Sequence, residues 1–292
     1  MRYAIGIDLG GTKIEGILMD EKGKVLKNYR MPTQAHRPLK VILNNIITVV
    51  EKLKDKPIQG VGIGVPGVVL PNGKLVDIPN IKPLKNLNIA KVLEKKLKTK
   101  VFAENDANCF ALAEHRLGAG KGTKNMLGVT IGTGIGGGII LNGKLYRGYV
   151  GAAGEFGHQV INPQGPKYGI LKGEFESWCS GPNIVKRYKK QGGKSDFTSP
   201  AHIFQSKEKI AKQVMKETYK YLGIGLGNLV NILNPDLIVL GGGVSNLPFY
   251  REVNITTKEF SMPCLRKRIK VVKNKLGDSA GKIGAAALVF QE

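Results

Sequence analysis

Apolar residues at the start of the chain fall into three short runs that read as strands. Tyr3–Leu9 leads directly into Gly10-Gly11-Thr12, and Ile14–Met19 follows at once. A turn over residues 20–24 separates the second run from a third near Val25–Tyr29. The pattern predicts an antiparallel meander whose first turn is rich in glycine.

Helical and strand-like patterns alternate along the next hundred residues. Leu39–Lys54 and Asn88–Lys98 carry apolar residues at helical spacing, and Gly60–Val65 reads as a buried strand. Val101–Ala103 is a further strand that leads into the polar triplet Glu104-Asn105-Asp106. This alternation favours an α/β fold.

The second half contains a loop-rich stretch and then regular elements. Little periodicity is found over Gly148–Gly181, whereas Ile210–Leu233 is a long helical pattern that Asn234-Pro235 ends. A buried strand over Asp236–Leu240 and a tail helix over Gly281–Phe290 complete the predicted elements.

The opening pattern recurs at an offset of 122 residues, where Leu127–Leu141 aligns with Ile5–Met19. Gly6 falls on Gly128 and Gly10 on Gly132, and a turn follows each copy. A repeat of this size predicts two related domains. We expect a small N-terminal domain over residues 1–107, with a C-terminal helix at 280–292 packing back on it, and a large domain over residues 108–279.

Composition restricts the class of protein. The hydrophobic share of 42% is that of a globular protein, the three cysteines are too few and too far apart for a disulfide framework, and no apolar run reaches the length of a membrane span. The strand at Tyr3 leaves no room for a leader, so we expect a cytoplasmic protein. The net charge of +23 comes from scattered lysines without interleaved aromatic residues, so we expect no specific nucleic-acid partner. Attraction of ATP or phosphosugars stays open as a role for that charge.

Three glycine clusters stand directly after apolar strands: Gly10-Gly11-Thr12-Lys13, Gly132-Thr133-Gly134 with Gly136-Gly137-Gly138, and Gly241-Gly242-Gly243. Glycine lets backbone N–H groups approach a ligand closely, and several such groups with a Thr hydroxyl and a Lys form a cradle for phosphates. The clusters predict a nucleotide site, although tight turns also favour glycine. None of them fits a P-loop or a dinucleotide fingerprint.

Two carboxylates stand where phosphoryl transfer would use them. Asp8 ends the first strand just before the glycine turn, where it could hold Mg²⁺ directly or through water or, alternatively, cap the turn. Asp106 could accept a hydroxyl proton while Asn105 orients the acceptor. Capping of the following helix is the structural alternative for one member of the triplet, but it does not explain all three.

Further polar groups occur in the loop-rich stretch, in Gly154-Glu155-Phe156-Gly157-His158 and at Glu176. Carboxylates and an imidazole can form charge-assisted hydrogen bonds to several hydroxyls on one face of a sugar. We therefore expect a polyhydroxylated substrate.

At these residues the chain resembles the ROK family of sugar kinases, within the actin-like ATPase superfamily. The resemblance rests on Asp8-Leu-Gly-Gly-Thr-Lys13, Glu104-Asn-Asp-Ala-Asn108, Gly132-Thr-Gly-Ile-Gly-Gly-Gly138, Gly154-Glu-Phe-Gly-His158 and Gly241-Gly-Gly243, in family order over nearly the whole chain. It implies two actin-like, ribonuclease H-like domains around an active-site cleft.

The resemblance also implies roles for individual residues. Asp106 would be the catalytic base, and Asn80, Asn105, Glu155, His158 and Glu176 would hold the sugar. Gly10, Gly11, Thr12, Lys13, Gly132, Thr133 and Gly134 would face the ATP phosphates, Gly242 the adenosine, and Asp8 the Mg²⁺. A homodimer or homotetramer is expected.

One departure from the family pattern concerns zinc. Most members carry Cys-x-Cys-Gly-x-x-Gly-Cys between the His and the second Glu, whereas Lys167–Glu176 is one residue shorter and contains no cysteine. Thiolates are the ligands that such a site requires, so no zinc is expected. Packing by Tyr168, Phe175 and Trp178 is our hypothesis for how the loop is braced instead.

The sequence thus predicts an ATP-dependent hexokinase of the glucokinase type, acting on the 6-hydroxyl of glucose. N-acetylglucosamine, N-acetylmannosamine, mannose and fructose stay open as substrates. A sugar-sensing regulator would need a DNA-binding segment, for which the strand at Tyr3 leaves no room. An ATPase that performs conformational work would not need Glu155, His158 and Glu176.

Overall fold

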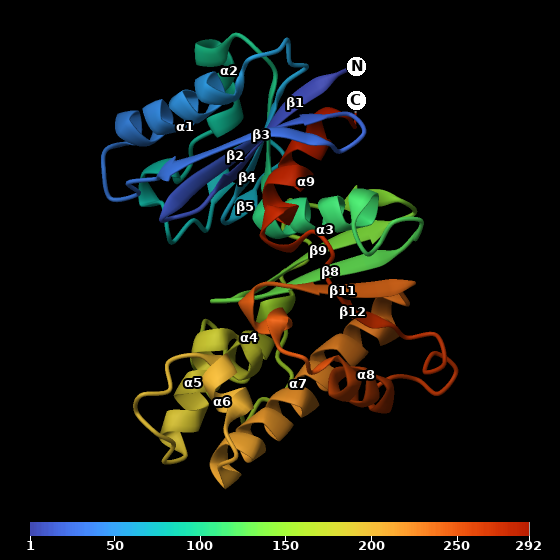
Figure 1. The fold of residues 1–292 in the computed structure, drawn as a ribbon. Coiled ribbons are helices and arrows are strands. Elements are labelled where there is room, and N and C mark those ends of the chain that lie inside the picture. Colours follow the sequence, from blue (N-terminus) through green and yellow to red (C-terminus); the bar gives the residue numbers. More distant parts are fainter. Residues whose placement is uncertain (292) are drawn as a thin grey trace. The chain divides into compact units, whose positions relative to one another are not determined.

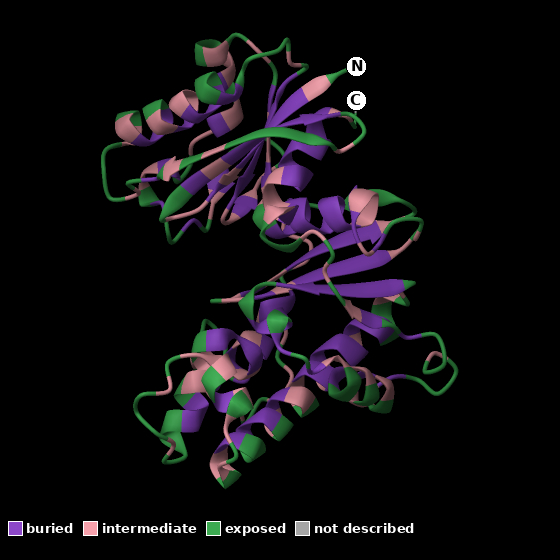
Figure 2. Cartoon of the chain, viewed as in Figure 1, coloured by how far each residue is buried: buried purple, intermediate pink, exposed green. Residues whose placement is uncertain are grey.

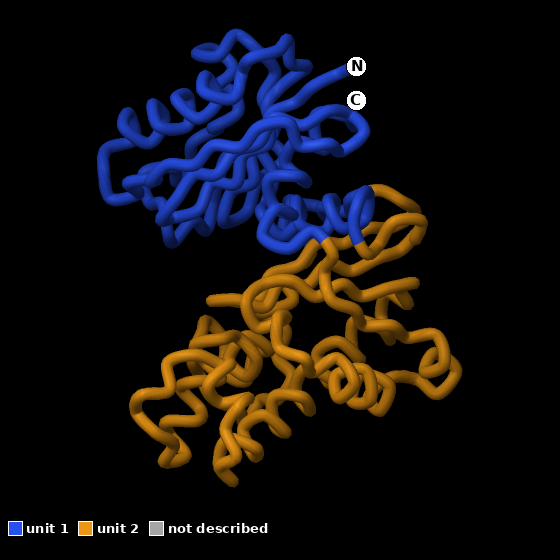
Figure 3. The backbone as a smooth tube through the Cα atoms, in the orientation of Figure 1, with its two compact units in different colours: residues 1–118, 145–153, 276–292 blue, residues 119–144, 154–275 orange. Residues whose placement is uncertain are grey.

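The computed structural model describes residues 1–291, which form two compact units (Figure 3). Unit 1 comprises residues 1–118, 145–153 and 276 onward, and unit 2 comprises residues 119–144 and 154–275. These units are defined by packing alone, and the predicted domain boundary at 107/108 stays a prediction.

Unit 1 is built on a five-stranded sheet of order β3-β2-β1-β4-β7 (Figure 1). The first three strands form the predicted antiparallel meander, and β1, β4 and β7 run parallel. All five predicted strands are confirmed, with small differences at their ends. They are β1 (Tyr3–Leu9), β2 (Lys13–Asp20), β3 (Val25–Pro32), β4 (Val61–Val65) and β7 (Val101–Asn105).

Helix α1 packs against β2 and β3 of this sheet, whereas α9 (Ala280–Val289) packs mainly against β1 and β4. The buried side of α1 (Leu39–Leu53) includes Ile42, Ile46 and Val50, which join the core formed by the strands. The remaining elements of unit 1 are α2 (Ile89–Leu97), α3 (Asp106–Leu117), α9 (Ala280–Val289), the small pair β5 (Val68–Val69) and β6 (Leu75–Val76), and the 3-10 turns η1 (Lys82–Leu84) and η4 (Gly277–Ser279).

Helix α9 lies directly on the backbone of β1 and β4, and it is buried along most of its length (Figure 2). A Cβ atom on Gly6 would lie 2.0 Å from the Lys282 carbonyl oxygen, and one on Gly62 would lie 1.8 Å from the Ala285 carbonyl oxygen. Only glycine permits this approach. The alanine-rich tail helix predicted at 281–290 therefore packs at a defined position on the sheet of unit 1.

The second sheet has the same design, with order β10-β9-β8-β11-β12, and all of it except Leu145 and Tyr146 of β10 lies in unit 2. Strands β8 and β9 form an antiparallel hairpin, and β8, β11 and β12 run parallel. The strands are β8 (Met126–Ile131), β9 (Ile135–Leu141), β10 (Lys144–Tyr146), β11 (Leu237–Gly241) and β12 (Val271–Lys273).

The helices of unit 2 follow this hairpin in the chain. The predicted long helix is α7, which ends where Asn234 takes a left-handed conformation just before Pro235. The helices and 3-10 turns are η2 (Phe156–His158), α4 (Phe175–Cys179), α5 (Gly181–Lys190), α6 (Pro200–Gln205), α7 (Lys209–Leu233), η3 (Gly243–Asn246) and α8 (Tyr250–Glu259).

The internal repeat predicted from the sequence is visible in the two sheets, whose strands have the same order and directions. The alignment at a fixed offset holds for β1 and β8 but not for the strands that follow. Leu9 pairs with Ile14 in the first hairpin, whereas Ile131 pairs with Ile135 in the second. The second turn is therefore one residue shorter, and β9 is displaced by one residue relative to β2.

Among residues 1–291, no helix combines the length and the apolar character that crossing a membrane would require.

Candidate functional site

The turn between β1 and β2 is closed and braced by hydrogen bonds. The N–H of Gly10 donates to the Lys13 carbonyl at 3.0 Å. Thr33 is fully buried, and it donates its N–H to the Thr12 carbonyl at 2.9 Å and its hydroxyl to the Gly10 carbonyl at 2.6 Å. Hydrogen bonds to the backbone thus hold the turn in place, while the side chains of Thr12 and Lys13 are exposed, where a ligand could reach them.

Two carboxylates and two lysines gather next to this turn. Lys13 Nζ lies 2.8 Å from Glu15 Oε2, and Lys282 Nζ, from α9, lies 3.7 Å from Glu15 Oε1. Asp8 stands opposite Glu15 in the β1–β2 pairing. Burial raises the pKa of Asp8 above its ordinary value, and Glu15 raises it further, although Lys282 and Lys13 act in the opposite direction. A cation placed beside Asp8 would favour its ionised form.

The parallel strands of unit 1 bring Asp8 and Asp106 to the same edge of the sheet. Asp8 pairs with Gly64 on β4, and Gly64 pairs with Glu104 on β7. Both carboxylates therefore lie where β1 and β7 end. Ligands of open α/β sheets bind at this edge, outside the carboxyl ends of the strands.

Glu104, the first member of the polar triplet, is a structural anchor. It is 3% exposed, and it accepts hydrogen bonds from Asn108 Nδ2 at 2.9 Å, from the N–H of Asn105 at 2.9 Å and from Arg147 Nε. These bonds satisfy a carboxylate that would otherwise be costly to bury. They also fix the path of the chain from β7 into α3.

Asn105 is the N-cap of α3. Its Oδ1 accepts from the N–H groups of Ala107 at 2.9 Å and Asn108 at 3.0 Å, and its Nδ2 donates to the Gly67 carbonyl at 3.0 Å. The amide nitrogen carries a second hydrogen. Asn105 therefore combines the capping role with a remaining donor that could serve a substrate.

Asp106 is the first residue of α3 and is exposed. Its Oδ1 accepts from the N–H of Ala107 at 2.8 Å, which holds the carboxylate at the helix N-terminus. A negative charge is stabilised at this end of a helix. The predicted catalytic base is therefore accessible and held in a defined orientation.

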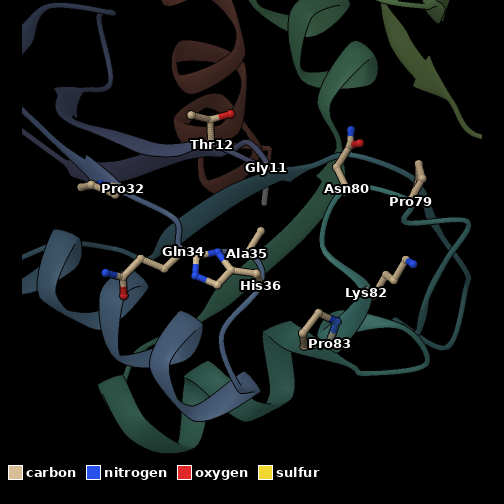
Figure 4. Close-up of a pocket in the computed structure, with 10 residues that line it drawn as sticks. All are labelled: Gly11, Thr12, Pro32, Gln34, Ala35, His36, Pro79, Asn80, Lys82 and Pro83. Carbon is tan, nitrogen blue, oxygen red and sulfur yellow. The ribbon is translucent and has the colours of Figure 1, made fainter.

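A pocket of about 700 Å³ in unit 1 includes part of the predicted site (Figure 4). Gly11 and Thr12 come from the β1–β2 turn, and Asn80 lies so close that a Cβ atom on Gly11 would be 3.1 Å from the Asn80 Cβ. Gln34 and His36 come from the segment before α1 and Lys82 from η1, so the pocket includes three polar residues that sequence analysis did not identify. The other lining residues are Pro32, Ala35, Pro79 and Pro83.

Replacing Glu104 tests its anchoring role. We expect Glu104→Ala to destabilise the protein by about 3 kcal/mol, because Asn108 and Arg147 lose a buried hydrogen-bonded carboxylate. Thermal unfolding followed by circular dichroism would measure this. The control is Glu21→Ala, which removes a surface pair with Arg2 and should leave the melting temperature almost unchanged. Equal melting temperatures for the two variants would contradict the anchoring role.

The corresponding turn of unit 2 is hydrogen-bonded to helices α4 and α5. The N–H of Gly132 donates to the Gly134 carbonyl at 2.9 Å, and the N–H of Gly181 donates to the Gly132 carbonyl at 2.8 Å. Glu176 Oε2 accepts from the N–H of Ile135 at 2.8 Å. Thr133 is exposed, and a Cβ atom on Gly132 would meet no heavy atom within 4 Å. The turn thus has open space in front of Gly132, whereas one carboxylate oxygen of Glu176 is engaged with the turn.

Gly137 of β9 and Gly157 of η2 allow these two elements to pack closely. A Cβ atom on Gly137 would lie 2.2 Å from the ring of Phe156, and one on Gly157 would lie 2.4 Å from the Ile135 carbonyl oxygen. These glycines let η2 pack directly on β9. A phosphate cradle in this cluster stays a prediction, and Gly137 is the member that packing against Phe156 requires to be glycine.

Turn η2 ends at His158, and Glu155, the other predicted sugar-binding residue of this segment, directly precedes it. His158 Nε2 lies 4.0 Å from Glu155 Oε2, and His158 Nδ1 lies 3.0 Å from Glu174 Oε2. Glu155 is exposed, whereas Glu174 is fully buried. One ring nitrogen of His158 is therefore held by the protein interior, and the other lies on the side of the exposed Glu155.

Gly242 is needed for the backbone of its turn. Its φ of +82° lies in the left-handed region, and a Cβ atom there would be 2.5 Å from the Ile131 carbonyl oxygen at the end of β8. Strands β8 and β11 are parallel, with Gly241 paired to Thr130. The turns at Gly132 and Gly242 therefore adjoin each other at the carboxyl ends of neighbouring strands.

Sequence analysis did not identify Glu104, Arg147, Glu174 or Lys282 as residues that shape the site. Of these four residues, only Glu104 stands out in the sequence, because it belongs to a polar triplet that helix capping alone does not explain. The partners of Arg147 and Lys282 are more than 40 residues away in sequence, so no local pattern reveals them.

Comparisons with known proteins agree with this architecture. Residues 4–292 match the ROK family. The chain is 35% identical to the N-acetyl-D-glucosamine kinase of Histophilus somni, covering 97% of both proteins, and 30% identical to the glucokinase of Thermotoga maritima, covering 98% of this chain and 96% of that one. The structure of a ROK family glucokinase from Streptomyces griseus in complex with glucose and AMPPNP superimposes with a TM-score of 0.82 at 30% identity, covering 99% of this chain and all of that one.

The fold class predicted from the sequence, α/β with actin-like domains, is confirmed by this match. The family expected from the motifs is confirmed over nearly the full length. The protein belongs to the ROK family.

Proposed function

We propose that the protein is an ATP-dependent sugar kinase in which Asp106 accepts the proton of the hydroxyl that attacks the γ-phosphate. The observation that carries this proposal is the position of Asp106, exposed at the start of α3 and on the same sheet edge as Asp8 and the β1–β2 turn. Phosphoryl transfer needs a base near the nucleophile and donors around the phosphates, with little covalent chemistry from the protein.

The roles of the remaining residues follow from their chemistry. Backbone N–H groups of the two glycine turns, with Thr12, Lys13 and Thr133, would hold the phosphates, and Gly242 would lie near the adenosine. Asn80, Asn105, Glu155, His158 and Glu176 would hold the sugar. The glucose and AMPPNP bound to the Streptomyces griseus relative support this pair of ligands.

Mg²⁺ would be held by Asp8 together with the nucleotide. Mg²⁺ prefers one or two carboxylates, with phosphates and water as its other ligands. Asp8 fits this role because it is a buried carboxylate beside the phosphate turn, and burial and the neighbouring Glu15 raise its pKa. The cation would offset the charge of the phosphates and keep Asp8 ionised.

The proposed substrate is glucose, phosphorylated at its 6-hydroxyl. The main alternative is N-acetylglucosamine, because an N-acetyl-D-glucosamine kinase is 35% identical to this chain. Steady-state kinetics with glucose, N-acetylglucosamine, N-acetylmannosamine, mannose and fructose would decide between them. We expect kcat/KM to be highest for glucose. A higher kcat/KM for another of these sugars would change the substrate and leave the reaction type intact.

A further inference from the structure

The loop over residues 159–175 closes on itself through backbone hydrogen bonds. The N–H of Phe175 donates to the Gln159 carbonyl at 2.9 Å, and the N–H of Ile161 donates to the Gly173 carbonyl at 3.0 Å. Gly173 has a φ of +73°, and a Cβ atom there would lie 1.7 Å from the Asn162 carbonyl oxygen. The two ends of the loop are thus joined, and Glu174 sits at the point of closure.

Aromatic residues brace this loop in part, as hypothesised from the sequence. Trp178 stacks on Tyr221 with ring centroids 3.6 Å apart, and Gly165 packs against the Trp178 ring. Phe175 is fully buried, whereas Tyr168 turns toward Lys186, whose Nζ lies 4.1 Å from its ring centroid. These contacts hold the loop, and the hydrogen bond to the imidazole of His158 comes from Glu174.

Glu174 links the loop to His158. Its Oε2 lies 3.0 Å from His158 Nδ1 and accepts the N–H of Leu171 at 3.2 Å, while its Oε1 lies 3.4 Å from the hydroxyl of Ser177. A Cβ atom on Gly169 would lie 1.7 Å from Oε1, so the loop backbone lies directly against the carboxylate. A fully buried carboxylate with these partners has one fixed position.

We propose that Glu174 is the positioning residue for His158: it accepts the hydrogen of Nδ1 and thereby presents Nε2 to a hydroxyl of the sugar. This inference rests on the proposed function only for the identity of the ligand at Nε2. A carboxylate that accepts from one ring nitrogen fixes both the tautomer and the plane of the ring. Glu174 thus supplies the orientation that, in relatives with a cysteine-rich loop, would have to come from another source.

The charges around His158 favour its protonated form. Burial alone would lower the pKa of His158, but the hydrogen bond and charge of Glu174, with further contributions from Glu155 and Glu176, raise it above the ordinary 6.5. Strand β9, which also packs on η2, contributes no titratable side chain. Below its pKa, Nε2 is a charged donor to a sugar oxygen, and above it Nε2 becomes an acceptor.

Nuclear magnetic resonance of the imidazole nitrogens tests this directly in the unmodified protein. The chain has four histidines, and the signals missing from a His158→Gln variant identify His158. We expect a pKa above that of an ordinary histidine and, in the neutral form, a hydrogen on Nδ1. A neutral ring that carries its hydrogen on Nε2, or a pKa at or below the ordinary value, would overturn the proposal.

A Glu174→Gln variant tests the same point through function. We expect the pKa of His158 to fall, KM for the sugar to rise about tenfold, the value of one hydrogen bond to a charged group, and kcat to change little. The upper pH limit of sugar binding should move to lower pH. Glu208→Gln is the control, because Glu208 also accepts hydrogen bonds in unit 2 but contacts Tyr188 and Lys194 instead.

The two proposals fail in different ways. If the protein phosphorylates no sugar but His158 has the expected tautomer and pKa, the proposed sugar kinase activity is wrong. The role of Glu174 in orienting the ring then still holds. Unchanged His158 signals and sugar KM in a folded Glu174→Gln variant would overturn the role of Glu174 and keep the kinase.

Discussion

Asp106→Asn is expected to lower kcat by about 10²–10⁴-fold, the usual effect of losing a general base. The amide has the size of the carboxylate and can still accept from the N–H of Ala107, so the start of α3 should be unchanged. KM for ATP and for the sugar should stay close to the wild-type values, because the lost interaction belongs to the transition state. Steady-state kinetics with a coupled assay for ADP would measure all three constants.

Asp55→Asn is the matched control for this experiment. Asp55 is a surface carboxylate of unit 1 that lies 3.3 Å from Lys27 Nζ, and its replacement should leave kcat unchanged. Near-normal turnover in Asp106→Asn would remove Asp106 from its catalytic role. An equal loss of kcat in both variants would show that kcat responds to the loss of any negative charge and not to Asp106 in particular.

Gly62→Ala is expected to destabilise unit 1 by about 3 kcal/mol or more, at the upper end of the cost of overpacking a core. The added Cβ atom would lie 1.8 Å from the Ala285 carbonyl oxygen, a backbone atom that cannot turn aside. Either α9 moves off β4 or the sheet distorts. A loss of this size should lower the melting temperature by roughly 6–12 °C, which calorimetry would detect.

The control for this prediction is Gly243→Ala, because a Cβ atom at Gly243 would meet no heavy atom within 4 Å. In the absence of nucleotide its melting temperature should match that of the wild type. A melting temperature for Gly62→Ala no lower than that of the control would show that α9 does not rest on β4 as described.

The regular elements could be predicted from the sequence because each has a local pattern. Strand Tyr3–Leu9 and helix Ile210–Leu233 are defined by residues within the element, and their ends follow from Gly10 and from Pro235. The register of the second hairpin could not be predicted, because one residue fewer in its turn leaves the glycine pattern almost unchanged.

The site could be predicted only as far as its residues stand in recognisable motifs. Asp8, Asn105 and Asp106 lie on one edge of unit 1 because parallel strands end together. Their supporting partners depend on tertiary packing: Arg147 reaches Glu104 from a distant loop, and Lys282 reaches Glu15 from the last helix. Gly137 was grouped with the phosphate turn because its neighbours are glycines, and only the position of Phe156 reveals its packing role.

The most direct test of sugar kinase activity is to identify the products that form from ATP, Mg²⁺ and a sugar. Phosphorus magnetic resonance distinguishes a sugar phosphomonoester from inorganic phosphate in the same sample. We expect one equivalent of phosphomonoester for each ADP, formation of both only when sugar is present, and loss of both in Asp106→Asn. Release of inorganic phosphate at a rate that does not depend on any of the five sugars would contradict the proposed function.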